Sequence, residues 1–400
     1  MDLKEYRYAS MNSQLKISSY RWVVLFAVFY VFVAFAFAFQ EVPPLMTPIM
    51  DEFNITNAEA SLLMSIVVIP GIFLGIPVGA SVDKYGVKLI GLISTVLIAI
   101  GGLTTALADS FVFALVGRLI LGFGGVFVTT AMPAIIPQWF QSKELGKAMG
   151  IYGINMPLAT VIAFQTVGML RLAYNWRYPF YIGAAIGIVA IVVLTLIVKD
   201  GPLKPKEHGQ WSDTRQVLQN AEIWKVSIVW LLFNAAALSF TAWAPSLFEN
   251  YKGIDPANAS FLASILMLAA IPFVPIYGWF SDKMGRRKPL MVIGSVLMAL
   301  AFITVAYTPN FALAASIIAL GATAAMVPPT ASALLPEILG PSSAGASFGV
   351  MALCLNIGAA LGPLLIGYLI DITKSLTSSF IGMALLSAVA AVVAFSLKAS

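Results

Sequence analysis

Long apolar segments separated by short polar connections make up almost the whole chain. A helix needs about 20 apolar residues to cross roughly 30 Å of hydrocarbon, and the tract 289–336 is long enough for two such helices. Its Thr308-Pro309-Asn310 sequence is a turn signal that divides it. The pattern predicts an all-α membrane protein with twelve transmembrane helices. They lie in the tracts 22–40, 60–82, 89–108, 110–140, 148–170, 178–198, 226–248, 256–281, 289–336 (two helices), 338–370 and 375–397.

Composition places the chain in the same class. Hydrophobic residues make up 60% of its 400 residues and charged residues only 10%, whereas soluble proteins carry about 25% charged residues. The one cysteine, Cys354, excludes an internal disulfide. The one histidine, His208, lies in a polar stretch, and a transition-metal site needs several convergent ligands. We therefore expect neither a metal nor another cofactor.

Two segments of the chain are variants of one phrase. Residues 79–88 read GASVDKYGVK, and residues 278–288 read GWFSDKMGRRK. The offset between Asp83 and Asp282 is 282 − 83 = 199 residues. Other turn residues repeat at this offset, since Gly122, Pro137, Gly146 and Gly150 meet Gly321, Pro336, Gly345 and Gly349. A repeat that extends over the chain indicates a duplicated fold.

The duplication predicts two pseudo-symmetric six-helix bundles, residues 20–198 and 226–397. A polar linker, residues 199–225, joins them, and its residues 213–221 are suited to a short surface helix. Residues 1–19 form the predicted N-terminal tail, and residues 398–400 form the C-terminus. We expect the linker to act as a tether without a role in substrate binding.

Lys and Arg are distributed unevenly between the two sides of the predicted spans. Of the 23 basic residues, only Arg171, Arg177, Lys252 and Lys374 lie in connections opposite the N-terminus, and Arg118 lies within a span. Because basic residues accumulate in cytoplasmic connections, we expect both termini in the cytoplasm and the protein in the cell membrane. The same distribution explains the net charge of +5 without a nucleic-acid partner.

The repeated phrase follows the second span of each set of six, and in this position it resembles the signature of the major facilitator superfamily (MFS). The resemblance covers residues 20–397 and is specific for the fold but not for the substrate. In the first copy, Lys88 is the only trailing basic residue, so this copy departs slightly from the pattern. The resemblance implies that the phrase controls conformational switching through Gly79, Asp83, Gly86 and Lys88, and through Gly278, Asp282, Gly285, Arg286 and Arg287.

The residue types of the phrase suit such a switch. Gly79 and Gly278 permit close helix contacts in a membrane, and Gly86 and Gly285 permit a tight reversal of the chain. Asp83 is expected at the cytoplasmic surface, where span five begins, and the positive N-terminal end of a helix attracts a carboxylate. Each half is then able to clamp the other shut on the cytoplasmic side. Alternatively, the two aspartates only cap their own loops.

Arg118 lies within span four, and the repeat places Ile317 opposite it. A charged side chain at mid-span costs at least about 2.5 kcal/mol on insertion scales and marks a functional site by default. Two roles are open for it. The guanidinium binds an anionic substrate, or it bonds backbone and polar groups of neighbouring helices, as the resemblance to the superfamily also allows.

Polar residues in the middle of spans are the other candidate ligands, because transporters built from repeats bind substrate near the midplane, between their halves. Such side chains also join helices to one another. Glu41, beside Pro43 and Pro44 at the end of span one, is the candidate coupling residue; it is either solvated at the outer margin or a proton acceptor. The candidate ligands besides Arg118 are Tyr30, Asn155, Gln165, Asn234, Thr241, Trp243 and Asn356.

These observations predict a secondary transporter and not an enzyme. The sequence contains no phosphate-binding glycine-lysine loop, which excludes transport driven directly by ATP. We expect a monomer in the lipid bilayer that moves a small organic solute, a carboxylate or other small anion, by alternating access with protons as the coupling ion. The alternative is efflux of apolar or cationic drug-like compounds, which an aromatic cavity with few charges suits equally well.

Overall fold

The computed structural model describes residues 3–140, 142–199, 201, 211–340 and 343–398. Within these residues all regular structure is helical, and twelve helical segments are long and apolar enough to cross a membrane. The predicted all-α class and the number of spans are therefore confirmed. The protein is an integral, multi-pass membrane protein.

The N-terminal half contains six spans. The first consists of three consecutive helical segments and the fifth of two. In chain order the helices are α1 (Leu3–Gln40), η1 (Pro43–Leu45), α2 (Met46–Phe53), α3 (Asn57–Tyr85), α4 (Val87–Ala106), α5 (Phe111–Trp139), α6 (Ser142–Tyr152), α7 (Asn155–Ala173) and α8 (Arg177–Ile197).

The C-terminal half repeats this arrangement after the linker. The linker contains α9 (Trp211–Gln219), close to the short helix predicted there. The spans of this half are α10 (Ala221–Lys252), α11 (Pro256–Met284), α12 (Lys288–Tyr307), η2 (Asn310–Ala312) with α13 (Leu313–Ala324) and α14 (Val327–Leu339), α15 (Ala344–Thr373) and α16 (Leu376–Phe395).

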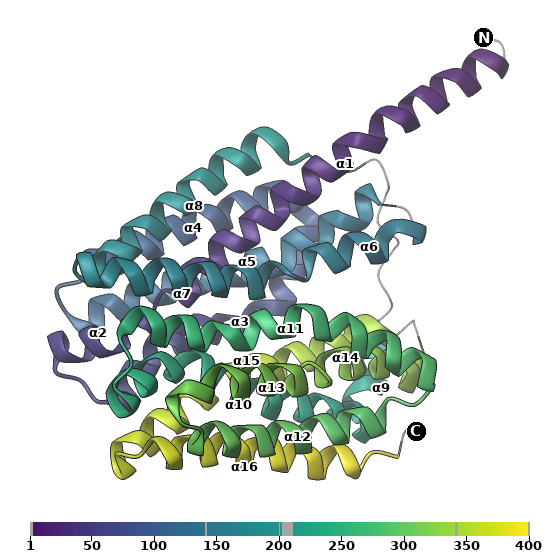
Figure 1. The fold of residues 1–400 in the computed structure, drawn as a ribbon. Helices are drawn as coiled ribbons and strands as arrows, with labels where there is room; N and C mark the ends of the chain where they lie inside the picture. Colours follow the sequence, from purple (N-terminus) through teal and green to yellow (C-terminus); the bar gives the residue numbers. More distant parts are fainter. Residues whose placement is uncertain (1–2, 141, 200, 202–210, 341–342, 399–400) are drawn as a thin grey trace.

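The first helix is longer than predicted. The backbone is helical from Leu3 without interruption to Gln40, so most of the predicted tail continues the first span. Figure 1 shows this part of α1 projecting beyond the bundle. The segment 3–40 contains neither glycine nor proline, and nothing in it ends a helix before Gln40.

Besides the first span, which is interrupted beside Pro43 and Pro44, two spans are interrupted at prolines. Pro157 has no N–H to donate to the carbonyl of Gly153, four residues earlier, and the chain turns between α6 and α7 at that place. Likewise, Pro328 and Pro329 have no N–H to donate to the carbonyls of Ala324 and Ala325, and the helix is interrupted there between α13 and α14. Other prolines, such as Pro70 in α3, remain inside continuous helices, so proline alone does not predict the breaks.

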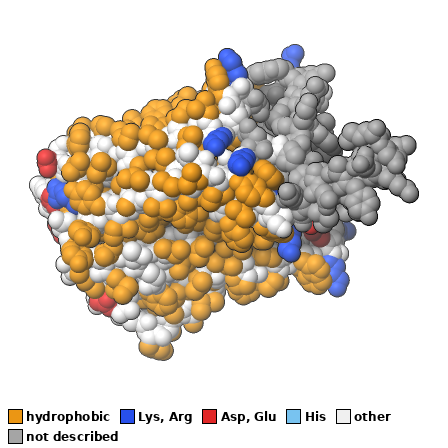
Figure 2. Space-filling view, turned by 90° about the horizontal axis from the view of Figure 1, so that it is seen from above, with side chains coloured by type: hydrophobic (Ala, Val, Ile, Leu, Met, Phe, Trp, Pro, Cys, Tyr) orange, Lys and Arg blue, Asp and Glu red, His pale blue; other side chains and the backbone are white. Residues whose placement is uncertain are grey.

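The two halves lie side by side with their helices roughly along one axis (Figure 1). The N-terminus, the linker and the C-terminus are at one end, which we call the linker end; α2 is at the opposite end, which we call the far end. Hydrophobic side chains cover most of the face between the two ends (Figure 2). This apolar surface is the one that contacts lipid.

Candidate functional site

At the far end, a carboxylate of one half caps a helix of the other half. Thr56 begins α3 with a capping box, in which its side chain accepts from the N–H of Glu59. Asp371, near the end of α15, accepts from the backbone N–H groups of Asn57 at 3.0 Å and Ala58 at 2.8 Å. The side-chain amide of Asn57 also donates to Asp371, at 2.7 Å. The start of α3 is therefore held by both halves.

Below this cap, α3 and α15 pack antiparallel through small residues. The hydroxyl of Ser61 donates to the carbonyl of Pro363 at 2.9 Å, and the hydroxyl of Ser65 donates to Ala360 at 2.6 Å. Gly367 leaves no room for a side chain, since a Cβ there would lie 2.8 Å from the carbonyl oxygen of Asn57 and closer still to Ser61. The far ends of the two helices are in direct contact.

An ion pair joins two other helices of the halves at the far end. Arg171 of α7 donates to both carboxylate oxygens of Glu249 of α10, at 2.9 and 2.8 Å, and to the carbonyl of Pro44 at 2.7 Å. The two charged side chains are 12% and 19% exposed. The bidentate geometry and partial burial make this link stronger than an ordinary surface ion pair.

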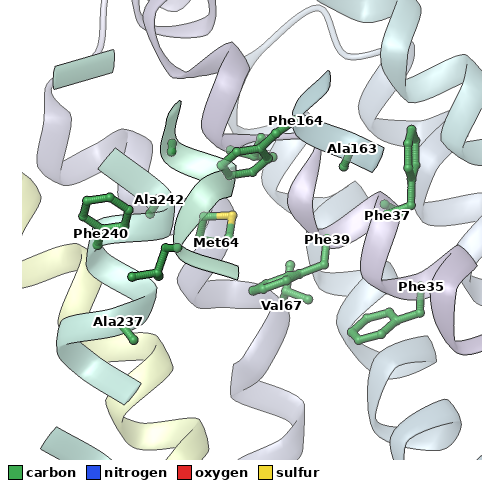
Figure 3. Close-up of a cluster of buried hydrophobic side chains, with 14 of the residues drawn as sticks. Phe35, Phe37, Phe39, Met64, Val67, Ala163, Phe164, Ala237, Phe240 and Ala242 are labelled. Atoms are coloured by element: carbon green, nitrogen blue, oxygen red, sulfur yellow. The ribbon is translucent and has the colours of Figure 1, made fainter. Parts of the chain in front are cut away.

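An apolar cluster lies beneath these links, between the halves (Figure 3). Phe39 comes from α1, Met64 and Val67 from α3, and Phe164 from α7, whereas Ala237 comes from α10 in the other half. All of these side chains are buried. The far end is thus closed first by polar contacts and then by a layer of packed hydrophobic side chains.

Toward the linker end, α3 and α15 no longer touch. A Cβ added at Gly75 or Gly79 of α3, or at Gly349 of α15, would meet no atom within 4 Å, whereas one at Gly71 would lie 2.8 Å from Oδ1 of Asn356. Within the described ranges, every hydrogen bond or ion pair between the halves lies on the far-end side of this position. Along α3 and α15, the two halves therefore lose contact beyond Gly71 and Asn356.

The second copy of the repeated phrase makes its contacts inside its own half. Arg287 pairs with Asp282 at 2.6 Å and with Glu337 at 3.1 Å. Partial burial lowers the pKa of Arg287, but the hydrogen bonds to these two carboxylates outweigh it, so the net pKa is raised. Arg286 is exposed. Gly285 has φ of +65°, which suits the tight reversal expected there.

In the first copy the chain also reverses direction at the glycine, since Gly86 has φ of +82°. Lys88 donates to the carbonyl of Thr195 at 2.9 Å, within the N-terminal half. The side chain of Asp83 lies outside the described part of the structure. A clamp between the halves through these aspartates stays a prediction, because Asp282 is turned to its own half in this conformation.

Arg118 is 1% exposed and binds backbone carbonyls of its own half. Its Nε donates to Leu63 at 2.9 Å, and its two terminal nitrogens donate to Ala38 at 2.7 Å and to Phe39 at 3.0 Å. The guanidinium thus ties α5 to α3 and to the end of α1. This geometry favours the helix-joining role over direct contact with substrate, which stays a prediction.

Glu41 is completely buried, so the expectation that it is solvated at the outer margin is wrong. The end of α1 turns inward after Gln40 and directs the carboxylate against Gly183 of α8, where any side chain would collide with it. Neither carboxylate oxygen has a hydrogen-bond partner among the described residues. The structure therefore holds a buried acidic group two residues after Phe39, whose carbonyl accepts from the buried Arg118.

The candidate ligands of α10 are tied to nearby carbonyls. The side-chain amide of Asn234 donates to Trp230 at 2.8 Å, and the hydroxyl of Thr241 donates to Ala237 at 2.9 Å. The indole N–H of Trp243 donates to Pro363 at 2.9 Å, and the Trp243 side chain is completely buried. Thr241 and Trp243 pack the C-terminal half in this conformation.

The remaining candidates are distributed over both halves. The hydroxyl of Tyr30 donates to Ile186 at 3.5 Å, and Asn155 lies buried at the start of α7. Gln165 of α7 is partly exposed and has no hydrogen bond within the described residues. Asn356 lies against Gly71 of the opposite half, at the point where α3 and α15 lose contact. Asn356 is thus placed directly between the halves.

Several residues of the far end were not among the predicted site residues. These are Asn57, Arg171, Glu249 and Asp371. A usable signal was present, because each is a charged or amide residue at the end of a predicted span on the side opposite the linker. Their pairing depends on how α3, α7, α10 and α15 meet, which a local sequence pattern does not contain.

Comparison with known proteins identifies one family and several distant relatives. The sequence model of the Major Facilitator Superfamily matches residues 24–255 and 245–399. The Hexuronate transporter of Bacillus subtilis is 22% identical over 372 residues, which are 86% of this chain and 87% of the relative. The Nitrite extrusion protein of the same organism is 23% identical, with 67% of each chain covered.

Solved structures share the fold at lower identity. A bacterial homologue of the human lysosomal transporter Spinster, in an inward-facing and occupied conformation, has a TM-score of 0.80 and 18% identity. That likeness covers 94% of this chain and 96% of the other. The nucleoside transporter NupG has a TM-score of 0.81 and 17% identity, covering 94% of this chain and 100% of the other.

Proposed function

Because the chain belongs to the Major Facilitator Superfamily, we propose that it moves a small organic solute across the membrane by rocker-switch alternating access. The observation that carries this proposal is the one-sided contact between the halves, which are bonded to each other at the far end and lose contact along α3 and α15 toward the linker end. Two six-helix halves that meet at one end only can exchange the open and closed ends by rocking against each other. The basic residues of the linker side support a cytoplasmic location for the linker end.

We infer that the solute is a carboxylate or another small anion. Two relatives with anionic substrates in their names support this class. Since Arg118 is engaged by three carbonyls, the substrate's charge is balanced by a co-transported proton instead of a fixed cation between the halves. Amide groups such as those of Gln165 and Asn356 supply hydrogen bonds to it.

Glu41 is the proposed proton carrier. A buried carboxylate without a hydrogen-bond partner is costly when ionised and neutralises readily by taking up a proton. Glu41 lies on the far-end side of the half, so opening of the far end would admit water to its carboxylate, and this couples the protonation of Glu41 to the conformation of the protein.

Efflux of apolar compounds is the second candidate function. Trp230 and Phe233 of α10 stack with their ring centroids 5.2 Å apart, and both are partly exposed. Aromatic side chains of this kind bind flat apolar solutes. This candidate predicts transport of lipophilic cations and little transport of organic acids.

Purified protein in liposomes distinguishes the two candidates. We expect saturable uptake of labelled glucuronate, a hexuronate, that increases when the outside is made more acidic than the inside. Glu41→Gln removes the protonatable group, so uptake driven by the pH gradient should fall at least tenfold, while exchange of labelled for unlabelled substrate persists.

The outcomes separate the parts of the proposal. Uptake of organic acids that is saturable but insensitive to the gradient would remove proton coupling and leave transport. Transport of lipophilic cations without any transport of organic acids would establish the efflux candidate. Flux that increases linearly with solute concentration would indicate a channel.

A further inference from the structure

We propose that Asp371 and the first residues of α3 form a lock at the far end, which holds this end closed while the linker end is open. The proposal rests on the alternating access proposed above and adds a specific device to it. In this device a carboxylate of one half caps a helix of the other, as the repeated phrase is expected to do at the linker end. The two locks would engage in turn.

The hydrogen bonds at the start of α3 show why Asp371 matters there. The leading N–H groups of a helix have no partner inside it. The side chain of Thr56 accepts from the N–H of Glu59, and the carbonyl of Thr56 accepts from the N–H of Ala60. The N–H groups of Asn57 and Ala58 remain, and both donate to Asp371 of the opposite half. The cap of α3 is complete only when the halves meet at the far end.

The charge of Asp371 adds to these contacts. A carboxylate is stabilised at the positive N-terminal end of a helix, and hydrogen bonds to an ionised acceptor are stronger than neutral ones. Asp371 is partly buried and also accepts from the side-chain amide of Asn57. Separation of the halves replaces these contacts with water, which favours the closed far end.

The repeat provides an internal control, because the other half lacks this device. The position equivalent to Asn57 is 57 + 199 = 256, which is Pro256, and the position equivalent to Asp371 is 371 − 199 = 172, which is Leu172. Pro256 has no N–H to donate, and α11 is capped within its own half by Asp255, which accepts from Asn258 at 3.2 Å. The duplicated scaffold therefore did not require the cap by Asp371.

The substitution Asn57→Pro tests the lock without removing the helix. Proline is favoured at the first position of a helix, and Thr56 already has the extended backbone (ψ of 166°) that suits a residue before proline. The variant loses both donors of Asn57 to Asp371 and copies the start of α11. The matched control is Asp255→Asn, which alters a cap that involves one half only.

The measurement is the distance between spin labels at Asp109→Cys and Phe311→Cys, with Cys354→Ser, in full-length protein in nanodiscs without substrate. Both label positions are exposed, and they lie in far-end connections of different halves. We expect Asn57→Pro to raise the ratio of long to short distances at least tenfold and Asp255→Asn to leave it unchanged. Asp371→Asn, which weakens the cap without changing the backbone, should shift it in the same direction.

An unchanged distance distribution in both Asn57→Pro and Asp371→Asn would overturn the lock. The proposed function would still stand if Arg171→Gln, which breaks a separate link between the halves, lengthened the far-end distance. If no variant changed this distance, and substrate did not change it either, alternating access itself would be contradicted.

Discussion

The two ends of α3 and α15 differ although the same two helices form both. At the far end they are in contact from Asn57 and Asp371 to Gly71 and Asn356, and at the linker end they are separated. At a close contact such as that of Gly367, glycine is needed because a side chain would collide with the opposite helix. Glycines that face open space, as Gly75 and Gly79 do, are explained when a second conformation brings the linker ends together. We therefore infer that this surface serves two conformations.

This comparison depends on each half moving as a unit. In the N-terminal half, Arg118 binds the backbone of α1 and of α3 from α5. Movement at one end is then transmitted to the other end because the helices of the half cannot slide freely past one another.

The largest effect is expected from Arg118→Ala. It leaves three buried carbonyls without the donors of Arg118, and removing one partner of a buried charged contact costs about 3–5 kcal/mol. We expect a loss of this size in the free energy of unfolding in detergent micelles. Arg118→Lys keeps the charge but cannot reach all three carbonyls, so its loss should be intermediate. Normal stability of Arg118→Ala would show that the half does not depend on this network.

A matched pair of glycine substitutions tests the two ends directly. Gly367→Leu places a side chain where α15 contacts Ser61, and overpacking of this kind costs roughly 1–3 kcal/mol. We expect it to open the far end, with a longer distance between far-end labels. Gly349→Leu on the same helix faces open space and should leave that distance unchanged while it slows transport. Equal effects of the two variants on the far-end distance would contradict the difference between the ends.

A smaller effect is expected from Arg171→Gln. The pair with Glu249 is only partly exposed, and loss of one such ion pair costs about 1 kcal/mol, or roughly a fivefold change in a population. We expect a modest increase in the far-end-open population. Salt titration provides the check, because the wild-type population should approach that of the variant as ionic strength rises. A wild-type population that is insensitive to salt would contradict a gating role for this pair.

The sequence predicts the fold better than the site, for physical reasons. The length of each span and the repeat of Asp83 at Asp282 can be read directly from the sequence. Neither signal changes with the conformation of the protein. The burial of Glu41 was not predictable in this way, because it depends on how α1 turns after Gln40 and on the space left by Gly183. The breaks at Pro157 and Pro328 were missed since Pro70 and similar residues sit in unbroken helices.

The far-end contacts show the same limit. Asp371 and Asn57 are 314 residues apart, and their meeting requires the relative position of two complete bundles. The dipole argument for Asp83 and Asp282 was available from sequence at the linker end, because the repeat identified those residues. Asp371 has no repeated partner to identify it.

Alternation between the two ends is tested most directly by measuring label distances at the far end and at the linker end of the same protein. Labels at Asp109→Cys and Phe311→Cys report the far end, and in a second sample labels at Tyr85→Cys and Met284→Cys report the linker end. In otherwise unaltered protein we predict a short far-end distance and a long linker-end distance, and Asn57→Pro should lengthen the first and shorten the second. Lengthening of the far-end distance without any shortening at the linker end would contradict alternation between the two ends.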